Sequence, residues 1–297
     1  MKTQRSFEEG GRGRLYLVAT PIGNLQDMTL RGLETLKTVD VIACEDTRRT
    51  RKLLSHFGIR TPFTSYHEHN QKKQGERILA WLREGKQVAL VSDAGTPLLS
   101  DPGEALVREA IEEGFPVVSI PGANAALSAL VVSGLPAKRF TFLGFLPRQE
   151  KALREELRRL RQAPETLILY EAPHRLARLL EMAIEELGDR PAVLARELTK
   201  RYEEIVRGSL SECRRWLEEA EVRGEFTVLI AGSGQGVEPE GTHGGEETPC
   251  WEEWDIPEHV EAYQRQGMAR MEAIKRVARE RGVPKREIYR LVHRQTK

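Results

Sequence analysis

The sequence contains few cysteines and has no apolar segment at its start. Of 297 residues only Cys44, Cys213 and Cys250 are cysteines, and no pair has the spacing of zinc ligands or of a disulfide framework. The segment 1–14, MKTQRSFEEGGRGR, lacks the apolar stretch of a secretory signal peptide. Because disulfides and secretion signals are both missing, we expect a cytoplasmic protein.

Metal ligands are scarce as well. His67 and His69 alternate in YHEHN, but no other clear ligand accompanies them. A zinc site needs three or four protein ligands. We therefore expect no metal in this protein.

One segment, 117–137, carries no charge and is long enough to span a bilayer. Pro121 and Gly122 interrupt it near its start, and the polar residues Asn124 and Ser128 follow. A buried strand, a turn and a buried helix explain this pattern better than a membrane span. We expect no membrane association.

The glycine fingerprint of dinucleotide-binding proteins is also missing. The nearest match, GSGQG at 232–236, follows a predicted strand but leads into an acidic stretch instead of a helix. Without the strand–loop–helix context such a match is weak. Its absence argues against NAD binding and against the common Rossmann type of methyltransferase.

Charge is distributed unevenly, although the net charge is only +1. Residues 235–256 contain no Lys or Arg but seven acidic side chains, and we interpret them as an acidic, Gly-rich linker. Residues 265–297 hold eleven basic and three acidic side chains, which favours a polyanionic partner.

Two short helices are predicted within the basic segment. Apolar residues recur with helical spacing around Ile274 and again around Ile288, and Gly282 and Pro284 separate the two runs. A helix, a short turn with glycine and a second helix form the helix-turn-helix pattern, although an ordinary α-hairpin looks the same in sequence. We predict that 257–297 is a basic helical RNA-binding module, with Lys285, Arg286 and Arg290 as its RNA-binding residues.

Strands alternate with helices in the rest of the chain. Predicted strands in the first half lie at 15–19, 39–43, 87–91 and 116–120, and predicted helices lie at 29–37, 47–57, 71–84 and 103–113. Predicted strands in the second half lie at 141–145, 166–170, 192–198, 203–208 and 225–232, and predicted helices lie at 150–162 and 173–187. This order predicts the α/β class, with a mainly parallel sheet in the first half and a mixed one in the second.

The predicted organisation has five parts. They are a flexible N-terminal tail at 1–13, an α/β domain at 14–135, a second α/β domain at 136–234, the linker at 235–256 and the helical module at 257–297.

Three turns follow predicted strands of the first half. They are TPIGN at 20–24, SDAGTP at 92–97 and IPGANAA at 120–126. Ligands of open α/β sheets bind at the carboxyl ends of the strands, and small residues there let the backbone approach a ligand closely. One such turn alone is simply a turn, but three at one edge predict a binding site.

Longer motifs surround these turns. They are LVATPIGNLQDMTLR (17–31), CEDTRRTRKLL (44–54), LVSDAGTPLLSDPG (90–103), IPGANAALSAL (120–130), FLGFLPR (142–148), YEAPHR (170–175) and RELTKRYEE (196–204). As a set they resemble the tetrapyrrole-methylase superfamily, or class III methyltransferases, and most closely its ribosomal RNA branch. The resemblance spans nearly all of 15–234.

The resemblance implies a homodimer whose two α/β domains hold S-adenosylmethionine in the cleft between them. Matched motif by motif, it implies that the cofactor-binding residues are Pro21, Asp93, Ala94, Gly95, Asn124, Ala125, Tyr170 and Leu198. It also implies methylation of a cytidine ribose 2′-hydroxyl in the decoding region of small-subunit (16S) rRNA, either free or in the assembled small ribosomal subunit.

A ribose hydroxyl is a weak nucleophile, so a nearby base or cation would help the transfer. Candidates beside the predicted cleft are Glu45, Asp46, Glu171, His174, Glu197 and Lys200, of which we favour Asp46, Glu197 and Lys200 as catalytic residues. The acidic candidates could equally pair with neighbouring arginines. Arg48 and Arg49 begin a predicted helix and suit RNA phosphate contact, or else belong to a solvated helix face.

Two other functions remain open. A precorrin-type tetrapyrrole C-methyltransferase would share the fold but has no evident use for a basic tail. A ligand-sensing DNA-binding regulator would use the tail and the pocket, but it leaves the charged clusters beside the cleft unexplained.

Overall fold

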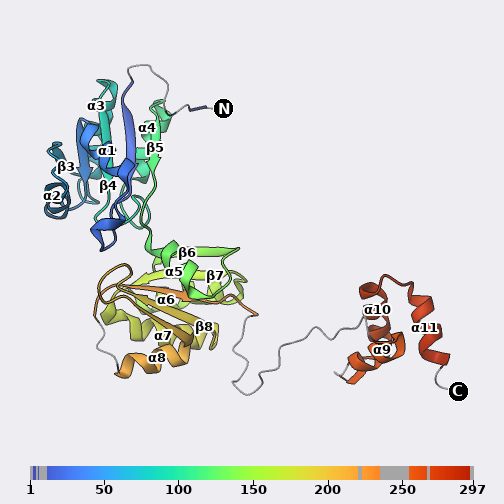
Figure 1. The fold of residues 1–297 in the computed structure, drawn as a ribbon. Coiled ribbons are helices and arrows are strands. Elements are labelled where there is room, and N and C mark those ends of the chain that lie inside the picture. The colour runs from blue at the N-terminus through green and yellow to red at the C-terminus, as the bar shows by residue number, and fades with distance from the viewer. Residues whose placement is uncertain are drawn as a thin grey trace. The chain divides into compact units, whose positions relative to one another are not determined.

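The computed structural model describes residues 3–4, 6, 12–219, 223–234, 254–265 and 268–294. They form two five-stranded sheets with helices and a small helical unit, which confirms the predicted α/β class (Figure 1). By its contacts the chain divides into two units, 1–237 and 238–297. Most of the predicted tail (1–13) and linker (235–256), together with Cys250, lies outside the described residues.

The first sheet is entirely parallel, with the strand order β3-β2-β4-β1-β5. Its strands are β1 (Arg14–Val18), β2 (Val41–Cys44), β3 (Phe63–Ser65), β4 (Gln87–Val91) and β5 (Val117–Ile120). Its helices are α1 (Leu30–Thr38), α2 (Thr47–His56), α3 (Gln71–Arg83) and α4 (Glu104–Glu112). Apolar residues of α1 and α2 pack on one face, and those of α3 and α4 on the other. Burial on both faces explains why the strands read as continuous apolar runs.

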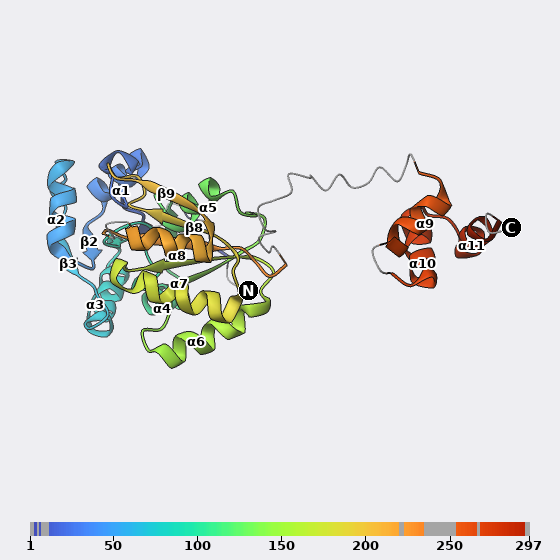
Figure 2. The same cartoon turned by 90° about the horizontal axis from the view of Figure 1, so that it is seen from below.

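The second sheet is mixed, with the order β6-β7-β10-β8-β9. Its strands are β6 (Phe140–Phe145), β7 (Thr166–Glu171), β8 (Pro191–Arg196), β9 (Glu204–Ser209) and β10 (Phe226–Ile230). The pair β6 and β7 is parallel, whereas β7–β10, β10–β8 and β8–β9 are antiparallel. One face is covered by α6 (Glu150–Arg159), α7 (Pro173–Leu187) and α8 (Leu210–Glu219) (Figure 2).

The helix α5 (Ala125–Ser133) covers the opposite face of the second sheet. Ala126, Ala129 and Leu130 pack there against strand residues that include Ile168 and Val193. Its packing thus joins α5 to the second sheet, although the sequence places it before the predicted boundary at 135. The domain boundaries stay a prediction.

The C-terminal unit contains three helices in its described part: α9 (Ile256–Arg265), α10 (Arg270–Glu280) and α11 (Lys285–Arg294). Val260, Ile274, Val277 and Ile288 form its core. Gly282, with φ of 65°, lies in the turn between α10 and α11, where the sequence predicts a break. The helix α9 was not predicted.

Smaller differences from the prediction lie at element ends and in short elements. The predicted helix 150–162 ends as α6 at Arg159 and continues as a 3₁₀ turn, Leu160–Gln162. The strand predicted to reach 198 ends at Arg196. The elements β3 and α8 were not predicted; β3 has only three residues, all half-buried, so it lacks a clear pattern. Among the described helices, none combines the length and the hydropathy needed to cross a membrane.

Candidate active site

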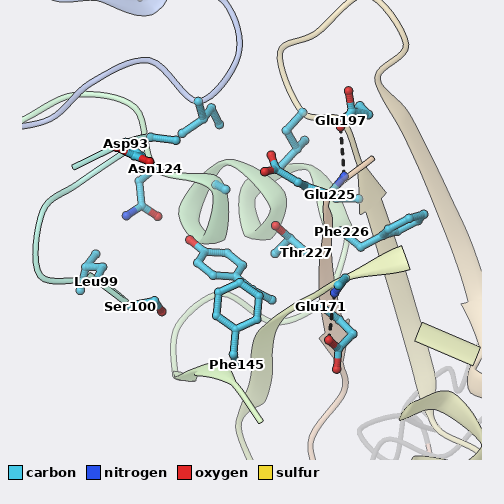
Figure 3. A pocket seen from close by; sticks show the side chains of 18 of the residues that line it. Asp93, Leu99, Ser100, Asn124, Phe145, Glu171, Glu197, Glu225, Phe226 and Thr227 are labelled. Carbon is cyan, nitrogen blue, oxygen red and sulfur yellow. Dashed lines mark hydrogen bonds between the residues drawn. The ribbon is translucent and has the colours of Figure 1, made fainter. Parts of the chain in front are cut away.

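A cavity of about 370 Å³ lies between the two sheets of the first unit (Figure 3). Loops after β1, β4 and β5 form one wall, where Asp93 and Asn124 lie. The other wall comes from the ends of β7 and β8 and the start of β10, where Tyr170 and Thr227 lie. Because β4, β1 and β5 are parallel neighbours, the structure brings the three predicted turns to one edge.

Hydrogen bonds join these turns to one another. The backbone N–H of Thr20 donates to the Gly95 carbonyl at 2.8 Å, and the Gly95 N–H donates to the Thr20 carbonyl at 3.0 Å. Gly95 has φ of 84°, and a Cβ there would lie 3.2 Å from Cγ2 of Ile22. The second turn therefore requires glycine both for its left-handed conformation and for its close packing.

Of the eight predicted cofactor-binding residues, seven line this cavity. They are Asp93, Ala94, Gly95, Asn124, Ala125, Tyr170 and Leu198. Pro21 instead lines an adjoining cavity of about 270 Å³, and its neighbour Ile22 lines the main one.

Asn124 has a structural task in addition to its place in the wall. Its Oδ1 accepts the backbone N–H of Leu127 at 3.0 Å and so caps the start of α5. Its Nδ2 donates to Oγ1 of Thr96 at 3.4 Å, which links the third turn to the second.

Asp46 does not line the main cavity. It is the N-cap of α2, where its Oδ1 accepts the backbone N–H of Arg48 at 2.8 Å. The hydrogen bonds from the Arg48 side chain and backbone lower the pKa of Asp46 to about 2. A carboxylate with so low a pKa is a weak base, so the geometry favours a capping role over the predicted catalytic one.

Glu197 and Lys200 do line the cavity, and they form an ion pair. Nζ of Lys200 lies 2.9 Å from Oε1 of Glu197 and 3.1 Å from Oε2 of Glu225. Burial raises the pKa of Glu197, but the hydrogen bonds from Lys200 and from the Glu225 N–H outweigh it and lower the pKa overall. Burial lowers the pKa of Lys200, and its two carboxylate partners more than reverse that effect. Both groups are therefore charged at neutral pH.

The loop between β8 and β9, which contains Glu197 and Lys200, connects the two sheets of the first unit. Oγ1 of Thr199 donates to Oδ2 of Asp27 at 2.6 Å, and the Lys200 side chain fills the space next to Gly23. Glu197 and Thr199 have φ values of 49° and 65°, a region that residues with a Cβ seldom adopt. These contacts place Lys200 against the first turn, at the edge of the cavity.

The carboxyl of Asp101 also lines the cavity, and the sequence analysis missed it. Burial, the negative charge of Glu45 and a hydrogen bond with that residue raise the pKa of Asp101 to about 7. Burial and the charge of Asp93 raise the pKa of Glu45 as well. The negative charge of Glu45 thus disfavours ionisation of Asp101. The motif LLSDPG contains Asp101, but nothing in it shows that Glu45 lies beside it.

Comparisons with known proteins agree with this architecture. Residues 14–214 match the family model of the Tetrapyrrole (Corrin/Porphyrin) Methylases. The chain belongs to this family. Two relatives named Ribosomal RNA small subunit methyltransferase I come from Halalkalibacterium halodurans and Bacillus subtilis. The first is 51% identical over 99% of this chain and 100% of the relative, and the second is 49% identical over 99% of each.

Solved structures of lower identity share the fold. A uroporphyrin-III-C-methyltransferase from Thermus thermophilus has a TM-score of 0.52 and 22% identity, covering 74% of this chain and 94% of that one. A diphthine synthase has a TM-score of 0.58 and 18% identity, covering 73% and 89%. As a member of the Tetrapyrrole (Corrin/Porphyrin) Methylases, the chain is a methyltransferase.

The predicted RNA-binding residues of this methylase occupy three places. Arg48 is 86% exposed and pairs with Asp46, whereas Arg49 lines the main cavity and lies 3.6 Å from Asp93. Lys285, Arg286 and Arg290 lie exposed on α11, in the other unit. No finding tests their role in RNA binding, which stays a prediction.

Aromatic side chains lie at the wall of the cavity, whereas the described cysteines are buried elsewhere. Tyr170 lies in the cavity wall between Phe142 and Phe145, with ring centroids 5.1 and 5.7 Å away. Cys44 and Cys213 are buried free thiols. Within the part of the chain that the structure describes, no three candidate metal ligands gather at one place.

Proposed function

We propose that the protein transfers a methyl group from S-adenosylmethionine to the 2′-hydroxyl of a cytidine in the decoding region of small-subunit (16S) rRNA. The observation that carries this proposal is the full-length similarity, at about half of all positions, to relatives named Ribosomal RNA small subunit methyltransferase I. The cavity supports it with a site of suitable size and chemistry. The proposed location is the cytoplasm.

The cavity residues fit S-adenosylmethionine. A volume of about 370 Å³ lies in the range of roughly 300 to 1,000 Å³ that is usual for small-molecule sites. Ala125, Tyr170 and Leu198 offer apolar surface for an adenosine, and Asp93 offers a carboxylate for a cationic group. The close turn at Gly95 lets the backbone approach the ligand.

The bound cofactor supplies an electrophilic methyl group. The protein's part is then to position the hydroxyl, exclude water and accept a proton. Asp101 is suited to accept the hydroxyl proton, because it lines the cavity and is partly ionised near neutral pH. Glu197 and Lys200 remain candidates that orient the substrate through their charges, and Asp46 supports α2 as its cap.

Two further features belong to this proposal. The basic unit at 257–297 would bind RNA, which a small-macrocycle methylase has no evident need to do.

A homodimer is supported by α5, where Leu127, Val131 and Val132 expose 49%, 76% and 43% of their surface. Contiguous exposed apolar side chains favour an interface.

A transfer experiment tests the function. The protein is incubated with S-adenosylmethionine carrying a labelled methyl group and, in parallel, with free 16S rRNA, assembled small subunits or a tetrapyrrole. We expect label in RNA, in a dinucleotide that resists alkaline hydrolysis because its 2′-hydroxyl is blocked. Label in the tetrapyrrole alone, or label on a base, would contradict the proposal.

A further inference from the structure

A second cavity, of about 520 Å³, adjoins the main one. We call it the side cavity; its wall includes Phe145, Arg148, Glu150, His174, Arg175 and Arg178. It shares Phe145, Glu171 and Ala172 with the main cavity. A ligand group held in the side cavity would therefore lie next to the proposed methyl-transfer site.

The side cavity lies where β6 and β7 end and α6 and α7 begin. Since β6 and β7 run parallel, their carboxyl ends meet at one edge, and the N-termini of both following helices lie there. Helix N-termini favour negative charge through their free N–H groups. This part of an otherwise antiparallel sheet thus has the geometry of an anion-binding edge.

Two cations in this wall are already engaged and hold it in shape. Arg175 donates from Nη2 to the carbonyls of Leu146 and Pro147, at 3.2 Å each. Arg178 pairs with Glu150 across the two helix starts. These bonds fix the loop after β6 against α7.

Two other side chains of this wall, an arginine and a histidine, are exposed. Arg148 and His174 line the side cavity, and neither makes a hydrogen bond or an ion pair with any residue that the structure describes. The carboxylate of Glu171 is already held by Arg175, 3.3 Å away, and by the Ala172 N–H. An arginine and a histidine that remain free beside two helix starts suit a phosphate group.

Two further groups suit the other parts of a nucleotide. Phe145 is 59% exposed, and its ring lies tilted by 60° from that of Tyr170, so aromatic surface is left for a base. The Glu171 side chain is only 1% exposed, and its Oε2 accepts no hydrogen bond from the described residues. That buried oxygen lies 3.3 Å from Nη2 of Arg175 in an ion pair, and it can still accept a hydrogen bond from a ribose hydroxyl.

We propose that the side cavity binds a ribonucleotide of the substrate strand next to the one being methylated. Its base stacks on Phe145, its phosphate lies between Arg148 and His174, and its ribose faces Glu171. This inference rests on the proposed function, because it takes RNA as the substrate.

The test uses the full-length protein, purified small subunits and a labelled methyl donor. For the double variant Arg148→Ala/His174→Ala we expect KM for subunits to rise about tenfold, with kcat and the affinity for S-adenosylmethionine unchanged. The slope of log KM against log salt should fall by about 1 to 2, since up to two phosphate contacts are lost. Phe145→Leu should raise KM, and Phe145→Trp should restore it because stacking returns.

The matched control is Arg215→Ala, which removes from α8 one exposed cation that pairs with no acidic residue in the described part of the chain and lies outside both cavities. If the wild type methylates subunits but the double variant behaves like this control, the inference is overturned and the proposed function stands. If the double variant loses affinity for the methyl donor, the side cavity serves the cofactor and the inference is also overturned. A wild type that methylates no RNA would overturn the proposed function itself.

Discussion

At the scale of single residues, position relative to other charges decides what each carboxylate can do. Asp46 and Asp101 both follow strands of the first sheet, yet their pKa values are moved in opposite directions, to about 2 and about 7. Asp46 receives hydrogen bonds from Arg48, whereas Asp101 is half-buried beside the carboxyl of Glu45. Asp46, one of the predicted catalytic residues, caps a helix, whereas Asp101, whose pKa is raised, lies in another motif.

The substitution Asp101→Asn tests whether the Asp101 carboxylate accepts the proton of the substrate hydroxyl. If the ionised form accepts the hydroxyl proton, the wild-type rate should rise with pH through about 7. The variant should lose about a hundredfold in kcat and show no such rise. Glu45→Gln is the companion variant: removing its negative charge should lower the pKa of Asp101 and shift the profile to lower pH. An unchanged profile in Asp101→Asn would exclude this residue as the base.

The same variant has a predicted effect on stability. The folded protein holds a proton on Asp101 at a pH where the unfolded chain releases it, because the pKa is about 7 instead of the ordinary aspartate value of 3.8. The stability that Asp101 contributes is therefore complete below about pH 4 and is lost as the pH rises through 7. Asp101→Asn should melt at a higher temperature than the wild type at pH 8, and the difference should vanish near pH 4.

Asp46→Asn separates capping from catalysis. Asparagine is as good an N-cap as aspartate but carries no charge. If capping is the role of Asp46, this variant should keep its melting temperature and activity, whereas Asp46→Ala should lower the melting temperature. Loss of methyl transfer in Asp46→Asn with normal melting would instead support the predicted catalytic role.

At the scale of elements, one buried arginine binds three backbone carbonyls that lie at the ends of different helices and strands, in the helical layer of the second sheet. Arg190 is 6% exposed and donates to the carbonyls of Leu187, Arg161 and Ala231. These carbonyls end α7, belong to the turn after α6 and follow β10, respectively. Burial and the nearby charge of Arg161 lower the pKa of Arg190. The layer that supports the side cavity is therefore tied together by a polar contact.

Arg190→Met should destabilise this layer by about 2 to 3 kcal/mol, because the buried carbonyls lose their donors. Chemical unfolding followed by circular dichroism measures the change. The control Arg159→Met removes a 75% exposed arginine paired with Glu156, and it should change stability by less than about 0.5 kcal/mol. Equal effects of the two substitutions would show that the three carbonyls are satisfied in another way.

At the scale of the whole molecule, the candidate active site and the basic C-terminal stretch lie in different units. The candidate active site lies within 1–237, whereas the stretch 265–297, with eleven basic and three acidic side chains, belongs to the other unit. On α11 the side chains of Lys285, Arg286 and Arg290 are exposed, while Ile288 is buried. The second unit thus presents a basic helix surface.

Deleting 257–297 should leave the affinity for S-adenosylmethionine intact and weaken RNA binding. Fewer phosphate contacts release fewer counterions, so the salt dependence of RNA binding should also become shallower. Calorimetry with the methyl donor and filter binding with 16S rRNA at several salt concentrations measure both effects. Unchanged RNA affinity and salt dependence in the truncated protein would assign the unit to packing or dimer formation.

Sequence alone was sufficient wherever the signal is local. The alternation of strands and helices, the three turns after β1, β4 and β5, and the break at Gly282 all follow from short-range backbone preferences and apolar spacing. The motifs also identified the family, and seven of eight predicted cofactor-binding residues lie in one cavity.

Only the tertiary structure decided which charges meet. It placed Glu45 beside Asp101, packed α5 on the second sheet and put Arg148 and His174 in the wall of one cavity. Each of these depends on how different elements pack against one another. The order of residues along the chain does not give these distances. A pKa value or a cavity wall, in contrast, depends on such distances.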